Sequence, residues 1–316
     1  MHNNWALKAN WCIGETGFGT GLNFLTTWKN ILATQSKLHF ISIEKHPIPP
    51  KQLKIIHQKW RQLSPLSEKL LAKYNPTIGE KQTIQLDQNI KLTLLYQDVK
   101  TACPNWKDKV DAWYLDGFAP EKNPAMWSKE LWDCLSKNSK PKARFATFTS
   151  SYKVQLGLFQ VGFLCTKEKG WGEKRKRLRG EFNPQAAKTA LAPYLNKSLM
   201  EASQRNATEE VQAYLNAGAN PNCNKNTSHS ALEIACKLGN FESLKLLVNY
   251  TSIAPTKVSE LIALTLNHSF CIKIVRLLDK TGIDFPYQDQ YGNSLIHLST
   301  QQQSTAFLDF WVAKKQ

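Results

Sequence analysis

The sequence predicts an α/β domain built on a parallel sheet, followed by an all-helical domain. In residues 1–185 short apolar stretches alternate with stretches of helical spacing, which is typical of a parallel sheet covered by helices on both faces. In residues 198–316 the pattern is helical throughout and recurs at a spacing of about 33 residues. We expect residues 186–197 to link the two domains.

Five apolar stretches are the expected strands of the first domain. The first ends in a glycine-rich turn, and the segment after it carries apolar residues at helical spacing, from Leu22 to Leu32. Ligands of such sheets bind beyond the carboxyl ends of the strands, so the polar residues that follow each strand are the candidates for a site. The expected strands are residues 11–13, 39–43, 92–96, 112–115 and 144–148.

The turn after the first strand has the sequence Gly14-Glu15-Thr16-Gly17-Phe18-Gly19-Thr20-Gly21. Glycines there let the backbone turn sharply and approach a ligand closely, and loops of this kind serve dinucleotides, S-adenosylmethionine or a tight turn alone. No Lys-Ser or Lys-Thr pair ends the loop, which argues against a phosphate-binding P-loop. An acidic residue inside it suits a cationic ligand. The candidate binding residues are Glu15, Gly17, Gly19, Thr20 and Gly21.

Acidic residues also follow the second and third expected strands. Glu44, with Lys45 after it, can hold both ribose hydroxyls of an adenosine, a device that NAD enzymes share; the alternative is a solvated loop charge. Asp98, followed by Val99, can accept a hydrogen bond from an adenine amino group, or simply begin the next helix.

The most distinctive segment is Asp111–Trp127, in which Asp116 ends the fourth expected strand. We expect its side chain to point into the crevice, where a carboxylate can orient an amine and take up its proton. Phe118 can stack on a splayed base.

Charge is distributed unevenly along the chain. Residues 1–200 hold 31 Lys and Arg against 15 Asp and Glu, whereas residues 201–316 hold 10 of each, so the whole excess of +16 lies in the first part. A one-sided basic field favours a polyanionic partner, although a merely basic soluble protein is the alternative.

The seven cysteines are scattered and include no Cys-x-x-Cys pair, which favours free thiols in the cytoplasm over disulfides or a zinc site. No apolar run is long enough for a membrane span, and the first residues do not read as a secretory signal, so no membrane partner is expected.

Five segments together closely resemble the MnmC-type methyltransferase family, over roughly residues 10–182. They are Gly14–Phe24, Glu44–Pro47, Asp116–Trp127, Ala146–Thr149, and Gly170–Gly172 before Lys174–Lys176. That family makes 5-methylaminomethyl-2-thiouridine at the tRNA wobble position. The resemblance implies a class I (Rossmann-like) methyltransferase fold, S-adenosylmethionine as donor, and the exocyclic amine of 5-aminomethyl-2-thiouridine in tRNA as acceptor.

The resemblance also implies roles for individual residues. Glu15 and the loop glycines would hold the methionine part of the donor, Glu44 the ribose and Asp98 the adenine, while Asp116 would hold the amine. A basic run would lie near the phosphates of the anticodon stem, the alternative being a solvated basic hairpin. The residues of that run taken as tRNA-binding are Lys174, Arg175, Lys176, Arg177 and Arg179.

The sequence departs from the family in three ways. Members usually carry a longer, aromatic-rich segment before the glycine loop, so impaired activity is one expectation. No second Gly-x-Gly-x-x-Gly follows residue 182, so neither the oxidase half of the bifunctional members nor its FAD is expected, and no metal is expected either. The third departure is the helical part. The alternative to an enzyme is an interaction protein with a truncated, inactive methyltransferase-like domain.

The helical part resembles ankyrin repeats, with about four units and atypical outer ones. Leu199, Leu232, Leu264 and Ile296 recur at spacings of 33, 32 and 32 residues. His297 stands at the histidine position of the repeat signature, where a role in the turn is expected. Because this part carries no net charge, we expect it to bind a protein partner rather than RNA; an unrelated helical bundle is the alternative.

Overall fold

The computed structural model describes residues 8–117, 120–170, 176–223, 229–250, 253, 255–266, 271–279, 291–301 and 304–314. The chain divides into two compact units, Met1–Thr189 and Ala190–Gln316.

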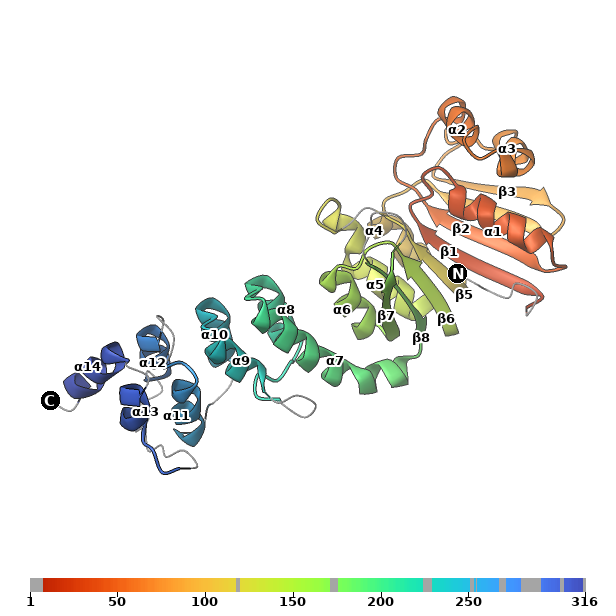
Figure 1. Ribbon diagram of the computed structural model, residues 1–316. Coiled ribbons are helices and arrows are strands. Elements are labelled where there is room, and N and C mark those ends of the chain that lie inside the picture. Colours follow the sequence, from red (N-terminus) through yellow and green to blue (C-terminus); the bar gives the residue numbers. More distant parts are fainter. Residues whose placement is uncertain are drawn as a thin grey trace. The chain divides into compact units, whose positions relative to one another are not determined.

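The first unit alternates strands and helices along the chain (Figure 1). Its elements are β1 (Asn10–Thr16), α1 (Leu22–Leu32), β2 (Lys37–Ile43), α2 (Pro50–His57), α3 (Ser64–Leu71), β3 (Lys81–Asp87), β4 (Ile90–Leu95), α4 (Val99–Ala102), β5 (Val110–Leu115), α5 (Lys129–Asn138), β6 (Ser139–Thr147), α6 (Tyr152–Gln160), β7 (Phe163–Lys169) and β8 (Lys176–Phe182).

Within the described residues these strands form one eight-stranded sheet in the order β3-β4-β2-β1-β5-β6-β8-β7. The five expected strands are β1, β2, β4, β5 and β6, and they are parallel to their neighbours within this group. The expected parallel sheet is one part of the observed sheet, which is mixed because β3 and β8 pair antiparallel with their neighbours. The chain leaves β1 toward β2 on one side, while β5 lies on the other, which creates a switch point beside β1.

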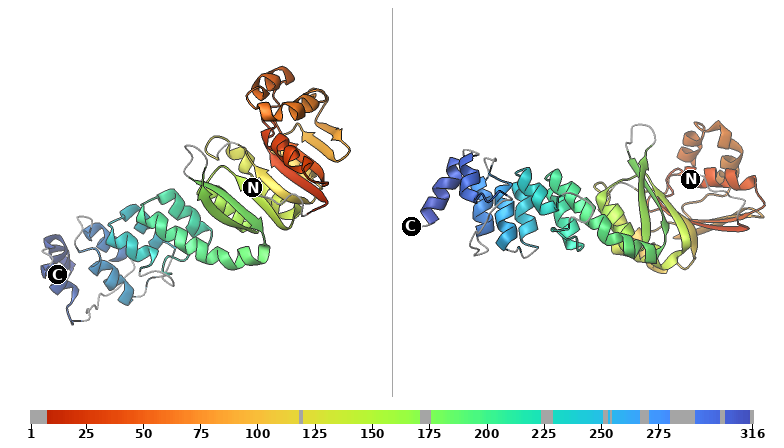
Figure 2. Two further views of the ribbon diagram at one scale, coloured as in Figure 1. Left: turned by 45° about the vertical axis from the view of Figure 1, so that its right-hand side comes forward. Right: turned by 60° about the horizontal axis from the view of Figure 1, so that its bottom comes forward.

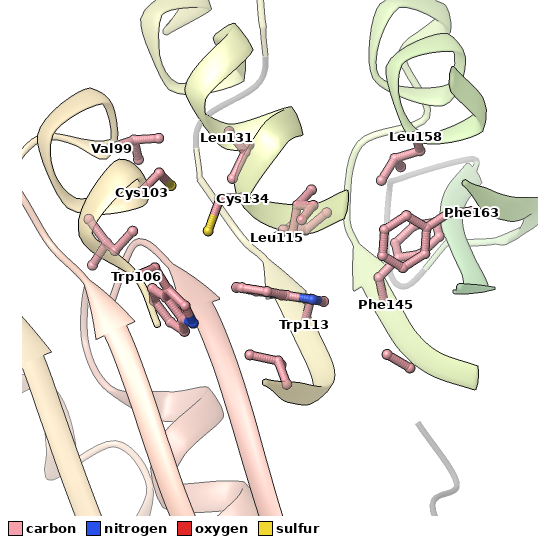
Figure 3. Close-up of a cluster of buried hydrophobic side chains, with 14 of the residues drawn as sticks. Val99, Cys103, Trp106, Trp113, Leu115, Leu131, Cys134, Phe145, Leu158 and Phe163 are labelled. Carbon is pink, nitrogen blue, oxygen red and sulfur yellow. The ribbon is translucent and has the colours of Figure 1, made fainter. Parts of the chain in front are cut away.

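Both faces of the sheet are buried, because alternate residues of the central strands enter different cores. In β2, Phe40 belongs to the cluster formed with α1, α2 and α3, whereas Ile41 belongs to the cluster formed with α4, α5 and α6. Helix α1 is amphipathic as its spacing predicts, and buries Phe24, Trp28 and Ile31. Figure 3 shows the second cluster, in which the Trp113 ring lies between β5 and the helices. Figure 2 shows the same layers from two further directions.

The second unit consists of helices connected by turns. They are the end of α7 (Pro184–Gln204), α8 (Thr208–Asn216), α9 (Ala231–Lys237), α10 (Phe241–Val248), α11 (Pro255–Ala263), α12 (Cys271–Asp279), α13 (Leu295–Gln301) and α14 (Thr305–Lys314). Helix α10 packs against α8 and α12, and α11 packs against α9 and α13, so consecutive helix pairs are stacked. No helix in the described ranges of either unit has the length and apolar character to cross a bilayer.

Turns of this unit are fixed by side chains at helix starts. Ser230 and Glu233 form a reciprocal capping box at the start of α9. At the start of α13, the backbone N–H of Ser294 donates to Nδ1 of His297 at 3.1 Å, the turn role expected for this histidine.

Candidate active site

A cavity of about 470 Å³ opens at the carboxyl ends of the parallel strands, next to the switch point. Its walls come from the turns that follow β1, β2, β4, β5 and β6. The lining residues are Gly17, Gly19, Ile43, Glu44, Lys45, His46, Gln97, Asp98, Val99, Asp116, Gly117, Asn123, Ala125, Met126 and Phe148.

The glycine loop forms one wall, and positive backbone angles explain its composition. Gly17 and Gly19 have φ of 87° and 51°, a region that side chains disfavour. A Cβ at Gly19 would meet nothing within 4 Å, so this backbone borders open space that a ligand can fill. Gly21 also has a positive φ, but its open side is occupied by the Phe18 ring, and Gly21 does not line the cavity.

Thr20 likewise lies outside the cavity wall, and its carbonyl has a structural partner. Nε2 of His57 lies 2.7 Å from the Thr20 carbonyl oxygen, and Nδ1 lies 2.6 Å from the Ser67 hydroxyl. A carbonyl only accepts, so Nε2 carries a proton and donates to the loop. His57 is buried beside a second cavity, of about 520 Å³, between α2 and α3. Sequence reasoning missed this histidine, because nothing in its local spacing indicates a contact with a loop 37 residues away.

Glu15 lies beneath the cavity rather than in its wall. Its side chain is 1% exposed and accepts hydrogen bonds from the Asn23 amide at 2.9 Å and the Ser42 hydroxyl at 2.7 Å. Burial raises the pKa of Glu15 to about 8, although these two hydrogen bonds oppose the shift.

Asn23 connects this buried carboxyl group to the cavity. Its amide nitrogen also donates to Oδ2 of Asp116 at 2.7 Å, so one side chain at the start of α1 holds the two acidic groups. Asp116 itself is exposed and follows β5 directly. Asn23 belongs to the recognised motif, but only the fold shows that it bridges β1 and β5. Phe118, the other expected catalytic residue, lies outside the described residues.

Glu44 directly follows β2 and is positioned by backbone amides. The N–H of Gly19 donates to Oε2 at 2.8 Å, and the N–H of His46 donates to Oε1 at 2.8 Å. The carboxylate is thereby tied to the glycine loop while still lining the cavity. This arrangement leaves lone pairs on both oxygens for a pair of hydroxyls.

Asp98 caps a helix and also lines the cavity. Its side chain accepts from the backbone N–H of Lys100 at 2.9 Å, which makes it the N-cap of α4, and it also lines the cavity. Its second oxygen lies 3.0 Å from Nζ of Lys45. These hydrogen bonds, that of Lys100 first, hold the pKa of Asp98 below its usual value.

The far wall of the cavity is apolar and aromatic. Gly117 is covered by Met126, whose Sδ would lie 1.5 Å from a Cβ at that position, so a side chain there would displace Met126. Phe148, just after β6, adds an aromatic side chain to the same cavity. Sequence reasoning placed these residues in motifs without assigning them to the cavity.

The basic run lies partly on the hairpin of β7 and β8. Lys174 and Arg175 fall outside the described residues, and Lys176 is exposed at the start of β8. Arg177 and Arg179 both pair with Glu168 across the hairpin, at 3.3 and 2.7 Å. Two of the five expected phosphate contacts therefore already have an anionic partner.

The chain is similar to known proteins over part of its length. Residues 61–183 match a family described as S-adenosyl-L-methionine-dependent methyltransferase. A protein of Vibrio vulnificus (strain YJ016) called tRNA 5-methylaminomethyl-2-thiouridine biosynthesis bifunctional protein MnmC is 40% identical over 204 residues, which is 60% of this chain and 30% of the relative. The protein of the same name from Ectopseudomonas mendocina (strain ymp) is 41% identical over 199 residues, 62% of this chain and 30% of the relative.

The chain thus spans about a third of the length of these relatives. Among solved structures, MNMC2 from Aquifex aeolicus is similar with a TM-score of 0.45 and 20% identity, covering 59% of this chain and 60% of that one.

Proposed function

We propose a methyl-transfer function for the first unit, on the premise that residues 61–183 are part of an S-adenosyl-L-methionine-dependent methyltransferase domain homologous to a region of MnmC proteins. The proposed reaction moves the methyl group to the exocyclic amine of 5-aminomethyl-2-thiouridine at the tRNA wobble position. The observation that carries the proposal is that Glu44, Asp98 and Asp116 line one cavity together with the glycine loop.

The residues present fit the donor. The cavity has the volume of a typical small-molecule site, and the open space at Gly19 admits a close backbone contact. Gly17 and Gly19 would contact the methionine part, with Glu15 supporting the loop from below. Glu44 would bind the ribose hydroxyls, and Asp98 with Val99 and Lys45 would border the adenine. When bound, S-adenosylmethionine supplies an electrophilic methyl group on a positively charged sulfur.

Asp116 carries the chemistry at the acceptor. An amine reacts through its lone pair, so the attacking nitrogen must be uncharged and aligned with the methyl group. The Asp116 carboxylate, oriented by the hydrogen bond from Asn23, would accept a hydrogen bond from this amine and take up the proton that the nitrogen loses. Phe118 and Phe148 are candidates to stack on the base.

The tRNA side of the proposal rests on charge. The excess of +16 in residues 1–200 suits a phosphate backbone. Lys174, Arg175 and Lys176 are the proposed phosphate contacts. Arg177 and Arg179 are proposed as further contacts, and both form ion pairs with Glu168. A tRNA substrate also implies a reaction in the cytoplasm.

The stacked helix pairs of the second unit support a docking module of the ankyrin kind, with a protein as partner. The sequence has the period expected of such repeats, and a side-chain hydrogen bond from Asn240 to the Ser203 carbonyl, at 2.8 Å, links two neighbouring pairs. This region carries no net charge, which favours a protein over RNA.

The test is transfer of labelled methyl groups to tRNA from cells that lack this modification step. The full chain is expected to label the wobble uridine, and Asp116→Ala to lower the transfer rate roughly 100-fold or more. Asp133→Ala, an exposed carboxylate on α5, is the control. If Asp116→Ala keeps the full rate, the catalytic role is wrong. If the chain binds the donor but labels no tRNA, the result favours the alternative of an interaction protein.

A further inference from the structure

Three side chains with metal-binding atoms lie close together at the amino ends of the strands. The candidate active site lies at the carboxyl ends, so the two sites are at opposite ends of the strands. The three residues are Cys12 of β1, His39 of β2 and Asp108, which precedes β5. The thiol sulfur, a ring nitrogen and a carboxylate oxygen all lie within 4.8 Å of one another. We propose that these three residues bind a transition-metal ion of the zinc type, with solvent completing the coordination.

The sheet itself brings two of the ligands together. Cys12 and His39 are direct neighbours in the parallel register of β1 and β2. The buried carboxylate of Asp111 fixes Cys12 further, because it accepts from the Cys12 backbone N–H at 2.9 Å. The third ligand is also held: the buried indole of Trp106 donates to the carbonyl of Asp108 at 2.9 Å. All three ligands are therefore positioned by contacts that do not involve their donor atoms.

His39 is oriented as metal-binding histidines are. Its Nε2 lies 3.0 Å from the hydroxyl of Thr93, an oxygen that can accept the ring proton and so leave the lone pair on Nδ1. Nδ1 lies 3.8 Å from Oδ1 of Asp108, which is too long for a hydrogen bond. Two ligands of one tetrahedral zinc ion are about 3.3–3.6 Å apart, given zinc–ligand bonds of about 2.0–2.3 Å, so the spacing leaves room for an ion between them.

The donor set selects the class of ion. One sulfur, one imidazole nitrogen and one carboxylate oxygen suit Zn²⁺ or Co²⁺ better than Mg²⁺ or Ca²⁺, which prefer oxygen ligands. Binding forms a metal–sulfur bond and releases the thiol proton to solvent. Burial raises the pKa of the Cys12 thiol to about 12, with Asp108 and Asp111 acting in the same direction and Lys140 and Lys91 against it, so the metal has to displace this proton. Cys12 and His39 are half-buried and Asp108 is exposed, so solvent can reach the remaining coordination positions.

The experiment measures metal binding by the full chain, independently of methyl transfer. Metal-free protein is titrated with Zn²⁺ against a colorimetric chelator, and Co²⁺ is added to a second sample to record the thiolate-to-cobalt absorption band. We expect one metal ion per chain and a cobalt band that shows a thiolate ligand. Cys12→Ser should abolish the band and lower the affinity at least roughly tenfold. Asp108→Asn, which alters only an exposed side chain, should lower the affinity to a similar degree and leave the Cys12 thiolate in place.

Two further variants keep the test decisive. Cys165→Ser removes a half-buried thiol on β7 and should leave stoichiometry and cobalt band unchanged. Thr93→Val should weaken binding roughly tenfold without removing the band, because it removes only the partner of the imidazole. The proposal is overturned if the chain binds no metal, if the bound cobalt shows no thiolate band, or if Cys12→Ser and Asp108→Asn bind as tightly as the unaltered chain.

Discussion

Glu15 and Asp116 share one hydrogen-bond donor, the amide of Asn23, yet one is buried and the other exposed. Asn23→Ala removes both hydrogen bonds at once. We expect the methyl-transfer rate to fall roughly 10- to 100-fold because Asp116 loses its orientation, with a smaller change in donor affinity. Steady-state kinetics and calorimetric binding of S-adenosylmethionine separate the two effects. Asn30→Ala, which alters an exposed asparagine on the same helix, is the matched control; equal rates for the two variants would contradict the role of Asn23.

The raised pKa of Glu15 makes stability depend on pH. Burial raises the pKa of this carboxyl group to about 8 in the folded chain, whereas the ordinary pKa of a glutamate side chain is 4.5. The unfolded chain therefore binds fewer protons in this window, and the free energy of unfolding contributed by Glu15 falls as pH rises from 4.5 toward 8. In urea unfolding at several pH values, Glu15→Gln should flatten this fall and gain stability relative to the unaltered chain at the alkaline end. Parallel pH profiles would show that the buried carboxyl is not the cause.

Residues that act within a continuous motif could be assigned from the sequence, whereas residues that act across the fold could not. Glu44 directly follows β2 and Asp98 lies in the turn after β4, so the rule for parallel sheets was enough to predict that both line one cavity. Thr20 and Gly21 belong to the same glycine motif but serve His57 and Phe18 instead of the cavity. The orientation of Thr20 depends on α2 and that of Gly21 on the conformation of the turn. The residues next to them in the sequence indicate neither.

Strands were predictable where both faces are buried and were missed at the edge. β1, β2, β4 and β5 appear as apolar stretches because they contribute side chains to the clusters on both faces, and β6 shows its apolar end where it enters one of them. β3 alternates exposed and buried positions, and β7 and β8 have only one and two buried positions, so all three strands mix charged and apolar residues. That weaker pattern explains why the antiparallel part of the sheet was not expected.

The hairpin of β7 and β8 is the element on which tRNA binding can be tested. Reversing the charges of Lys174, Arg175 and Lys176 to Glu should weaken tRNA binding and flatten its dependence on salt, because fewer counterions are released. Filter binding at several salt concentrations measures both. The control reverses three exposed lysines of α7 and α10, Lys188, Lys197 and Lys245, and gives the same net charge. If both variants lose the same affinity and slope, net charge and not the hairpin governs binding.

Stacking of the helix pairs depends on Asn206, whose side-chain oxygen accepts from the backbone N–H and the hydroxyl of Ser243 at 3.2 and 2.8 Å. Its φ of 52° is tolerated by glycine, so Asn206→Gly removes the acceptor without adding strain. We expect the free energy of unfolding of the second unit to fall by about 1 kcal/mol. Circular dichroism during unfolding in urea measures this change. Asn249→Gly, at an exposed position after α10, is the comparison; an equal loss there would argue against this contact.

At the scale of the whole molecule, the two compact units differ in charge and in whether they contain the proposed donor site, and this predicts two responses to heating. S-adenosylmethionine at about 100 times its dissociation constant stabilises the fold that binds it by about 2.7 kcal/mol, and the proposed site lies entirely in the first unit. Nine of the ten tryptophans precede residue 190, so their fluorescence follows this unit, whereas far-ultraviolet circular dichroism also follows the second. The donor should therefore raise the fluorescence midpoint by several degrees and leave a separate dichroism transition in place. A single transition that moves as a whole would show that the units unfold together and that the helix pairs share in the stability of the site.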